Sequence, residues 1–359
     1  MDRFRLAHAT GEDWQAAAGA CAGELGRIEV PPGRRPLGFV YVTDLWAQHL
    51  HAIADALKAA TGVADWVGTT GIGACATGAE YFAVPALVAL VGDFPAGGVR
   101  LLAGDGAAAG AVFGVVHGDP RRREVLQALA DTAERSGAFL VGALASSRGG
   151  YAHVAGGPVD AALSGALFGE EVAVATALTQ GCSPLGPAHQ VTAADDETVL
   201  ALDGEPALKV LAADLQAAGI TEASRLAGGL FAAFPIAGSD MGDYLVRNLV
   251  DIDPSNGGIT VAHRPLVGDT LAFCRRDAEA ARADLARMLV RLKARAAAPR
   301  GGVYFSCVAR GPNLFGPRAQ EMNAIRDALG DVPLAGFFAN GEISAGRLYT
   351  HTGVLALFL

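Results

Sequence analysis

The stretch VYFSCVARGPNLFGPRAQEMNAIRDALGDVPLAGFFA, residues 303–339, decides the fold of this 359-residue chain. It begins with a short apolar run of β-forming residues, 303–307, and ends with a second such run, 333–339. Between the two runs, apolar residues at helical spacing predict a helix over 320–329. Strands joined through a helix run parallel in one sheet, so the stretch predicts a strand–helix–strand unit.

The same order of elements occurs twice earlier in the chain. Each copy has a strand, a helix, a second strand that leads into a glycine-rich turn, and a closing strand. The predicted strands are 38–42, 65–70 and 86–91 in the first copy, 112–116, 139–143 and 161–168 in the second, and 354–358 as the closing strand of the third. The predicted helices of the first two copies are 45–60 and 124–135. We therefore predict an α/β fold with mixed sheets covered by helices, built from repeated strand–helix–strand–strand units in two regions.

The middle of the chain has a different pattern. β-Strands are predicted at 172–179, 191–193 and 198–202, followed by a helix over 206–217. Two further strands are expected at 257–262 and 270–274, and a helix at 278–295. We predict an N-terminal extension over residues 1–34, a first domain over 35–222 and a second domain over 223–359.

Composition excludes several classes of protein. Hydrophobic residues make up 51% of the chain and charged residues 18%, which a disordered chain does not show. A net charge of −9 argues against nucleic acid as a partner. Apolar stretches are far shorter than the ~20 residues of a membrane span, and the start MDRFR is not a signal peptide, so we expect no membrane partner.

Cysteine and histidine usage indicates the compartment and the cofactor requirement. The five cysteines are far apart and none has CxxC spacing, so we expect reduced thiols and a cytoplasmic location. The eight histidines form no HxH or HExxH pattern. We therefore expect neither a metal nor another cofactor.

Polar side chains follow both strands of the parallel pair in the quoted stretch. Arg310 lies just after the first strand, and Glu342 lies in the turn after the second. The carboxyl ends of parallel strands open on one side of a sheet, so both loops should meet there. Arg310 is suited to bind a ligand carboxylate and Glu342 to receive an ammonium group, with Phe315 and Phe337 as apolar walls. The alternative is a salt bridge between Arg310 and Glu342.

Four further residues are ligand-binding candidates, each with a structural alternative. Asn313 and Asn340 either bond a ligand or shape turns. Arg247 either binds a ligand or pairs with Asp251 or Asp253. Cys182 binds a ligand or is a buried turn residue; like Cys307, it is a nucleophile only with a base in reach and a lowered pKa.

Five motifs occur in a defined order along the chain. They are GCSPLGP (181–187), LDGEPAL (202–208), DYLVRN (243–248), FSCVARGPNLFG (305–316) and PLAGFFANGEI (333–343). Together they resemble the FIST family of sensory domains, with its paired N-terminal and C-terminal regions, over about residues 35–359. The two predicted domains, 35–222 and 223–359, correspond to these two regions.

The resemblance implies a function. FIST domains are proposed to bind small ligands such as amino acids, so the chain resembles an intracellular sensor of a small polar metabolite. As a standalone member it would pass the signal to a partner protein through a conformational change, and it would not be an enzyme. Two alternatives remain open: an enzyme of unknown class with a cysteine nucleophile, and a protein-binding scaffold.

Overall fold

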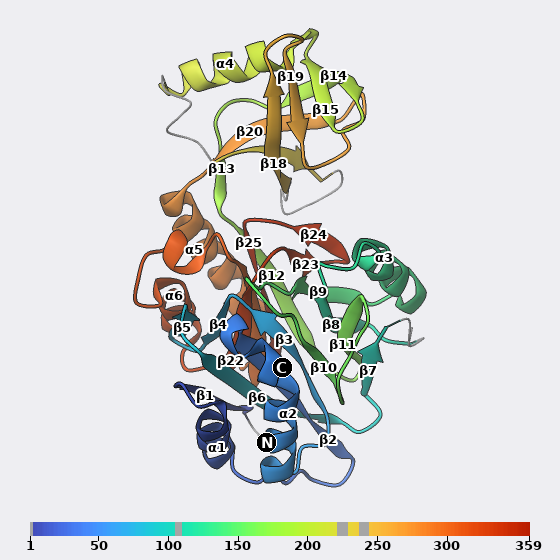
Figure 1. The fold of residues 1–359 in the computed structure, drawn as a ribbon, viewed down its shortest axis with the longest axis vertical. Helices are drawn as coiled ribbons and strands as arrows, with labels where there is room; N and C mark the ends of the chain where they lie inside the picture. The colour runs from blue at the N-terminus through green and yellow to red at the C-terminus, as the bar shows by residue number, and fades with distance from the viewer. Residues whose placement is uncertain (1–2, 105–109, 221–228, 237–243) are drawn as a thin grey trace. The chain divides into compact units, whose positions relative to one another are not determined.

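The computed structural model describes residues 3–104, 110–220, 229–236 and 244–359 (Figure 1). The chain forms two compact units. Unit 1 comprises Met1–Gln180 together with Arg282–Leu359, and unit 2 comprises Gly181–Ala281. Unit 2 is therefore an insertion in the sequence of unit 1.

Unit 1 contains three repeats, each built on a parallel strand pair with a helix between the strands. The first strands are β2 (Arg34–Thr43), β8 (Phe113–Gly118) and β21 (Gly301–Cys307). The helices are α2 (Leu50–Thr61), α3 (Val125–Ser136) and α6 (Gln320–Leu329). The second strands are β3 (Trp66–Gly71), β9 (Phe139–Leu144) and β22 (Leu334–Ala339). Each first strand pairs with its second strand in parallel, which confirms the predicted units.

Two antiparallel strands complete one side of each sheet. The closing strands β6 (Ala86–Pro95), β11 (Leu163–Phe168) and β25 (Thr352–Phe358) pair with the first strands. An outer strand then pairs with each closing strand: β1 (Arg5–Thr10), β7 (Val99–Ala103) and β12 (Val174–Gln180). The sheets are therefore mixed, as predicted.

The other side of each sheet is completed by a strand from a different repeat. The strand β4 (Gly73–Ala76) of repeat 1 pairs with β22 of repeat 3, and β4 continues into a hairpin with β5 (Ala79–Phe82). The strand β10 (His153–Ala155) of repeat 2 pairs with β3 of repeat 1. The strand β23 (Glu342–Ser344) of repeat 3 pairs with β9 of repeat 2 and forms a hairpin with β24 (Arg347–Tyr349). Each repeat thus donates one strand to the next in a closed cycle.

One glycine holds the same position in the second strand of every repeat. Gly68, Gly142 and Gly336 lie opposite Val40, Val116 and Tyr304 in the parallel pairs. A Cβ atom at any of the three would lie 1.6–1.8 Å from the carbonyl oxygen of the residue opposite. The three repeats therefore share the same close approach of backbones.

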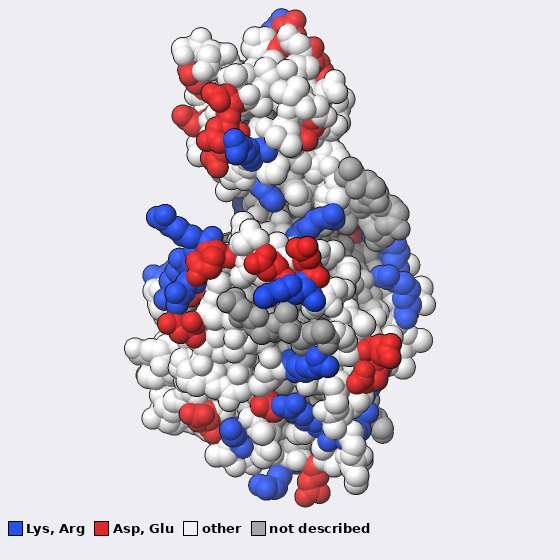
Figure 2. All heavy atoms as spheres, turned by 90° about the vertical axis from the view of Figure 1, so that its right-hand side faces the viewer, with Lys and Arg blue, Asp and Glu red and all other residues white. Residues whose placement is uncertain are grey.

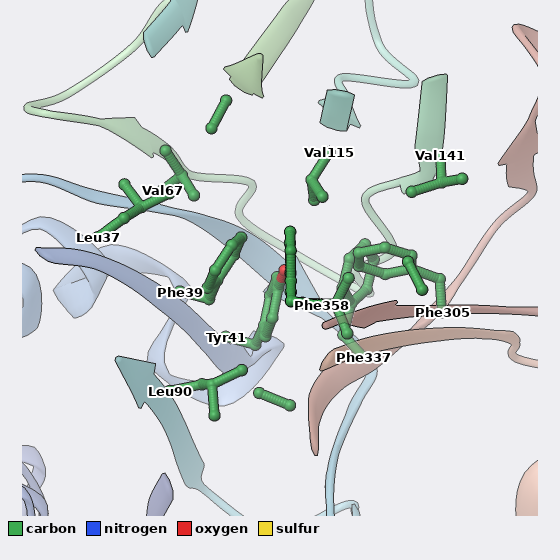
Figure 3. Packing of buried hydrophobic residues seen from close by; sticks show 14 of the residues in the cluster. Leu37, Phe39, Tyr41, Val67, Leu90, Val115, Val141, Phe305, Phe337 and Phe358 are labelled. Atoms are coloured by element: carbon green, nitrogen blue, oxygen red, sulfur yellow. The ribbon is translucent and has the colours of Figure 1, made fainter. Parts of the chain in front are cut away.

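The three sheets enclose a common core (Figure 3). Tyr41, His117 and Phe305 hold equivalent register positions, and their ring centroids lie 5.5–6.1 Å apart. Burial lowers the pKa of His117 to about 3, so its ring is neutral at pH 7 and lies 3.2 Å from the Tyr41 hydroxyl. A second triangle from the closing strands has centroid separations of 5.2–5.3 Å; its members are Phe94, Phe168 and Phe358.

Helices cover the outer faces of these sheets. In β2, Phe39 and Tyr41 point to the common core, whereas Val40 and Val42 pack with α2 and with α1 (Trp14–Leu25). The helix α3 covers the β8–β9 sheet in the same way. The β21–β22 sheet is covered by α6 and α5 (Ala278–Arg295) (Figure 1). None of the described helices has both the length and the apolar character needed to span a membrane.

Unit 2 is a small barrel with one helix. Six of its strands close into a ring in the order β20-β14-β15-β19-β18-β17, because β17 also pairs with β20. These strands are β14 (His189–Asp195), β15 (Thr198–Leu202), β17 (Leu230–Pro235), β18 (Tyr244–Asp253), β19 (Gly258–Val261) and β20 (Thr270–Arg276). The helix α4 (Ala207–Ala217) packs on the barrel through Leu211 and Leu215. Two short strands, β13 (Cys182–Pro184) and β16 (Glu205–Pro206), pair with β20 and β15 respectively.

The compact units divide the chain along different lines from the predicted regions. Residues 1–34, expected as an N-terminal extension, contain β1, which belongs to the first sheet of unit 1, and α1, which packs on that sheet. The predicted boundary between residues 222 and 223 lies outside the described residues.

Basic and acidic side chains are interspersed over much of the described surface that Figure 2 shows. On that face, Lys and Arg side chains form small groups near acidic ones and do not extend into one continuous field.

The shared glycine gives a sharp test of the repeat geometry. We expect Gly336→Ala to cost at least about 3 kcal/mol of unfolding free energy, because the new methyl group collides with a backbone oxygen. Gly23→Ala is the control, since it lies in α1 with open space around its Cβ position. That change should be neutral or stabilising by about 0.5–1 kcal/mol. Urea unfolding of both variants measures this, and equal midpoints would contradict the assigned register.

Candidate functional site

A fully buried arginine lies just after the first strand of repeat 3. Arg310 is 0% exposed and directly precedes a single 3-10 turn, Gly311–Asn313. Its Nε donates to Glu321 Oε1 at 2.8 Å, and its Nη2 lies 2.7 Å from the same oxygen. Burial disfavours the charged form of Arg310, but Glu321 outweighs that effect and raises the arginine pKa.

Glu321 is the centre of this buried network. It lies in the first turn of α6 and is also 0% exposed. Its carboxylate accepts hydrogen bonds from the Tyr304 hydroxyl at 2.7 Å, the Ser306 hydroxyl at 3.1 Å and the Gly311 amide at 3.0 Å. A carboxylate near a helix N-terminus is also stabilised by the helix dipole. The network therefore stabilises the packing of α6 against β21.

The alternation of β21 explains why these groups meet. Side chains along a strand point alternately to opposite faces. Phe305 therefore enters the common core, while Tyr304 and Ser306 face α6. Gly311 has a φ of +48°, and a Cβ there would lie 2.6 Å from the Phe338 ring. Glycine at this position lets the loop bring its amide to Glu321.

Phe315 connects the network to the molecular surface. Its ring lies 5.0 Å from the Arg310 guanidinium carbon and 5.9 Å from that of Arg282 on α5. Arg282 also donates from Nη2 to the Phe315 carbonyl at 2.6 Å. The ring is thus held by two cations, one buried and one at the edge of a groove.

A groove of about 470 Å³ lies between α5 and α6. Apolar side chains and Phe315 form most of its lining; those of α5 are Leu285, Ala286, Leu289 and Val290, and those of α6 are Ala324 and Ala328. The polar groups at the groove are Arg282, Gln320, Asn323 and Asp327. Its volume is within the range of small-molecule sites, and its mixed lining is typical of them.

Glu342 is buried, and no charged side chain of the described residues forms an ion pair with it. Its Oε2 accepts from the Thr352 hydroxyl at 2.7 Å and the Thr352 amide at 3.2 Å. Burial raises the pKa of Glu342 to about 8, although Thr352 and the more distant Arg310 oppose the shift. Within the described part of the chain, its Oε1 and the Nη1 of Arg310 have no hydrogen-bond partner. The alternative salt bridge between Arg310 and Glu342 is not among the ion pairs of the described residues, since Glu321 takes that role.

The other predicted ligand-binding residues of unit 1 have separate positions. Asn313 is exposed, and its side-chain amide donates to the Val308 carbonyl at 2.8 Å, so it shapes the turn. Asn340 is exposed, and its backbone amide bonds Leu144. Phe337 belongs to the common core. The loop after β21 begins beside the end of β22, where the Val308 amide donates to the Ala339 carbonyl at 2.9 Å. That the loops after β21 and β22 form one ligand site stays a prediction.

Cys182 and Arg247 belong to unit 2. Cys182 is buried in a small apolar cluster with Phe231 and Cys274. Arg247 lies on β18 and donates from Nη1 to the Val246 carbonyl at 2.9 Å; burial lowers its pKa. A ligand-binding role for Cys182 or Arg247 stays a prediction.

The surroundings of Cys307 are unfavourable for a nucleophile, and the histidine that is close to Cys182 in sequence has other partners. Burial, with a smaller contribution from Glu342, raises the pKa of Cys307 to about 12. His189, close to Cys182 in sequence, lies instead between Asp203 at 2.7 Å and Asp214 at 3.1 Å. Among the described residues, no three His, Cys, Asp or Glu side chains gather as metal ligands would.

The residues that sequence reasoning missed are Glu321, Tyr304, Ser306 and Arg282. Glu321 carried a signal: it shares the inward face of the predicted helix with Ile325, four residues on, where a carboxylate is out of place. A charged residue on an apolar face predicts a buried partner, and Arg318 and Arg310 are the two basic residues that most closely precede Glu321.

The fold defines an α/β protein of three strand-exchanged repeats with an inserted barrel. A FIST N domain matches residues 36–205 and a FIST C domain matches residues 207–345. The chain therefore belongs to the FIST family, whose domains are associated with sensory signal transduction.

Curated relatives come from mycobacteria. The chain is 37% identical over 191 residues to "Uncharacterized protein Rv0628c" of Mycobacterium tuberculosis (strain ATCC 25618 / H37Rv), covering 51% of this chain and 50% of that protein. It is 37% identical over 194 residues to "Uncharacterized protein Mb0898c" of Mycobacterium bovis (strain ATCC BAA-935 / AF2122/97), with the same coverage. The matched stretch thus spans about half the length of these relatives.

Breaking the buried ion pair should be costly. Arg310→Met leaves Glu321 buried without its cation, so we expect a loss of about 3–5 kcal/mol of unfolding free energy. The double variant Arg310→Met/Glu321→Met should lose clearly less than the sum of the single changes. Asp160→Ala removes an exposed ion pair with Arg122 and should cost at most about 1 kcal/mol. Additive single and double losses in chemical denaturation would contradict the coupling.

The raised pKa of Glu342 predicts a pH dependence of stability. The folded carboxyl holds its proton up to about pH 8, whereas the unfolded one releases it near its ordinary pKa of 4.5. The folded state binds more protons in this window, so this group makes stability fall as pH rises, with a slope approaching about 1.4 kcal/mol per pH unit.

Glu342→Gln keeps the shape and removes the titration. Its stability should therefore fall less steeply than that of the natural chain between pH 5 and 8 (roughly the window between the two pKa values). Burial raises the pKa of Glu80 to about 7, and Glu80 makes the same contribution to the pH dependence of stability in both proteins. Parallel pH profiles for the two proteins would show that Glu342 is ionised in the fold.

Proposed function

We propose that this chain is a sensory module whose ligand is a small, elongated carboxylate bound in the groove between α5 and α6. The observation that carries the proposal is the groove itself, with apolar walls and an arginine at one end. Membership of the FIST family supports a sensory role.

The direction of the two helices limits the ligand. Arg282 bonds the Phe315 carbonyl ahead of α6, and Lys293 bonds the Ala328 carbonyl near the end of α6 at 2.8 Å. The helices therefore run in the same direction, and Arg282 and Asp327 lie at opposite ends, on the order of 10 Å apart at 1.5 Å per residue. An α-amino acid carries its two charges close together and reaches only one end. A carboxylate with an apolar body, or one with an amine at its far end, fits better.

The same geometry suggests how a bound ligand would be sensed. Phe315 lines the groove and stacks on Arg310, and Gln320 precedes Glu321 in the chain. A ligand that displaces Phe315 or shifts α6 would act directly on the buried ion pair. The signal to a partner protein would then be a shift between two packings of this network.

Two other functions compete with this proposal. A partner's amphipathic helix would use the same apolar lining at i, i+4 spacing on α5, which is the scaffold alternative. An enzyme with a cysteine nucleophile has less support, because burial raises the pKa of Cys307 to about 12.

Thermal-shift measurements with straight-chain carboxylates and ω-amino carboxylates of increasing length test the ligand class. α-Amino acids serve as the comparison series. A ligand at 100 times its Kd should add about 2.7 kcal/mol of stability. Turnover of a stabilising compound would favour the enzyme alternative, and stabilisation by α-amino acids alone would contradict the elongated-carboxylate class.

A groove-filling variant tests the location. Ala324→Trp should abolish the shift, because its side chain occupies the groove. Ala20→Trp, an exposed helical alanine of α1, should leave the shift unchanged. An equal ligand shift in both variants would place the site elsewhere.

A further inference from the structure

Two cysteines meet at the start and end of unit 2. Cys182 is two residues beyond Gln180, where the chain enters this unit. Cys274 lies on β20, the last strand before the chain returns to unit 1 through α5. These are far apart in sequence but are on paired strands, β13 and β20.

The strand register brings both thiols to one side of the pair. Cys182 lies opposite Arg276, and Pro184 lies opposite Cys274. Cys182 and Cys274 are thus diagonal neighbours on the same face of the strand pair. Both belong to one apolar cluster with Phe231, Ala233 and Val246. None of the other three cysteines, Cys21, Cys75 and Cys307, is in that cluster.

We propose that Cys182 and Cys274 form a redox-reactive dithiol that closes to a reversible disulfide with small-molecule disulfides. Cys182 is 6% exposed and Cys274 is 0% exposed, so the reagent reaches Cys182 first. Arg275 and Arg276 are exposed beside it, which favours an anionic disulfide such as oxidised glutathione.

The reaction balances in two exchange steps. The Cys182 thiolate attacks one sulfur of oxidised glutathione, forming a mixed disulfide and releasing one glutathione thiolate. The sulfur of Cys274, which gives up its proton, then attacks the Cys182 sulfur and releases the second glutathione. The protein loses two electrons and two protons, and the reagent is reduced to two thiols.

The different exposures of the two thiols fit a division of roles. Cys274 is fully buried, and the neighbouring Cys182 thiol and burial raise its pKa, so Cys274 is poorly suited to attack a reagent in solvent. It is well placed to attack a mixed disulfide on its neighbour. Diagonal strand neighbours have Cα atoms about 7–8 Å apart, slightly beyond the usual disulfide span, so closure needs a small strand shift and the bond reopens readily.

Closure would join the strand that enters unit 2 to the strand that leaves it. The crosslink would enclose nearly all of the barrel in one covalent loop. Since a crosslink restricts the unfolded chain, unit 2 should become more resistant to heat and proteolysis in the oxidised form.

The test uses the full chain equilibrated with increasing ratios of oxidised to reduced glutathione, then acid-quenched, unfolded and alkylated for mass spectrometry. We expect Cys182 and Cys274 to become resistant to alkylation together, with no glutathione attached to either. The other three cysteines should be alkylated at every ratio. Dithiothreitol should restore both thiols. Alkylation of both at every ratio, or a stable adduct on the natural protein, would overturn the proposal.

Single substitutions separate a dithiol from independent thiols. In Cys274→Ser, Cys182 should retain one bound glutathione; in Cys182→Ser, Cys274 should stay reduced. Cys21→Ser, in the α1 helix, is the control and should behave as the natural chain. Circular dichroism confirms that each variant is folded, and either variant suffices because their expected products differ. Protection of Cys274 in Cys182→Ser would contradict the assigned pairing.

Discussion

Unit 1 depends on the cyclic exchange of one strand among its three repeats. Because β4, β10 and β23 each complete a sheet that belongs to another repeat, no sheet is finished until all three repeats are present. Ser146 lies where the repeats meet: its hydroxyl donates to the Phe338 carbonyl of repeat 3 at 2.5 Å and accepts from the Ile72 amide of repeat 1 at 2.8 Å. One buried side chain of repeat 2 thus bonds both other repeats at the carboxyl ends of their strands.

The strand exchange also explains where the buried polar side chains lie. The inward faces of the strands are filled by aromatic and aliphatic side chains, so the common core has little room for a ligand. The polar network of repeat 3 lies instead on the outer face of β21, beneath α6. It leaves the groove between α5 and α6 in contact with Arg310 through a single ring, Phe315. A sensor built this way needs only a small movement of α6 to disturb a buried charge pair.

Local patterns were sufficient to predict the repeats and their helices. The helices at 278–295 and 320–329 and the strand at 198–202 have the predicted bounds, because strong periodicity and clear breaks mark them. The exchange was not predictable, since β4, β10 and β23 are only three or four residues long and carry no periodic signal. The strands β17 and β18 were also missed, in part because β18 places Arg247, Asp251 and Asp253 among its apolar residues.

The candidate site, too, was predictable only in part. The loops after β21 and β22 begin at the same edge of the sheet because the two strands are parallel, and so this placement was predictable. The true partner of Arg310 depends on how α6 is rotated above the sheet, which long-range packing decides. For that reason Glu321 was found only in the structure, and Phe315 is the one predicted residue that also lines the groove.

Native-state hydrogen exchange of the full chain tests the central claim of cyclic exchange most directly. The amides of β4, β10 and β23 each bond a different repeat. If the three repeats form one cooperative structure, these amides share a single opening free energy, equal to that of the parallel pairs β2–β3, β8–β9 and β21–β22. Opening of one repeat at a lower free energy, with the amides of the other two still fully protected, would contradict the account.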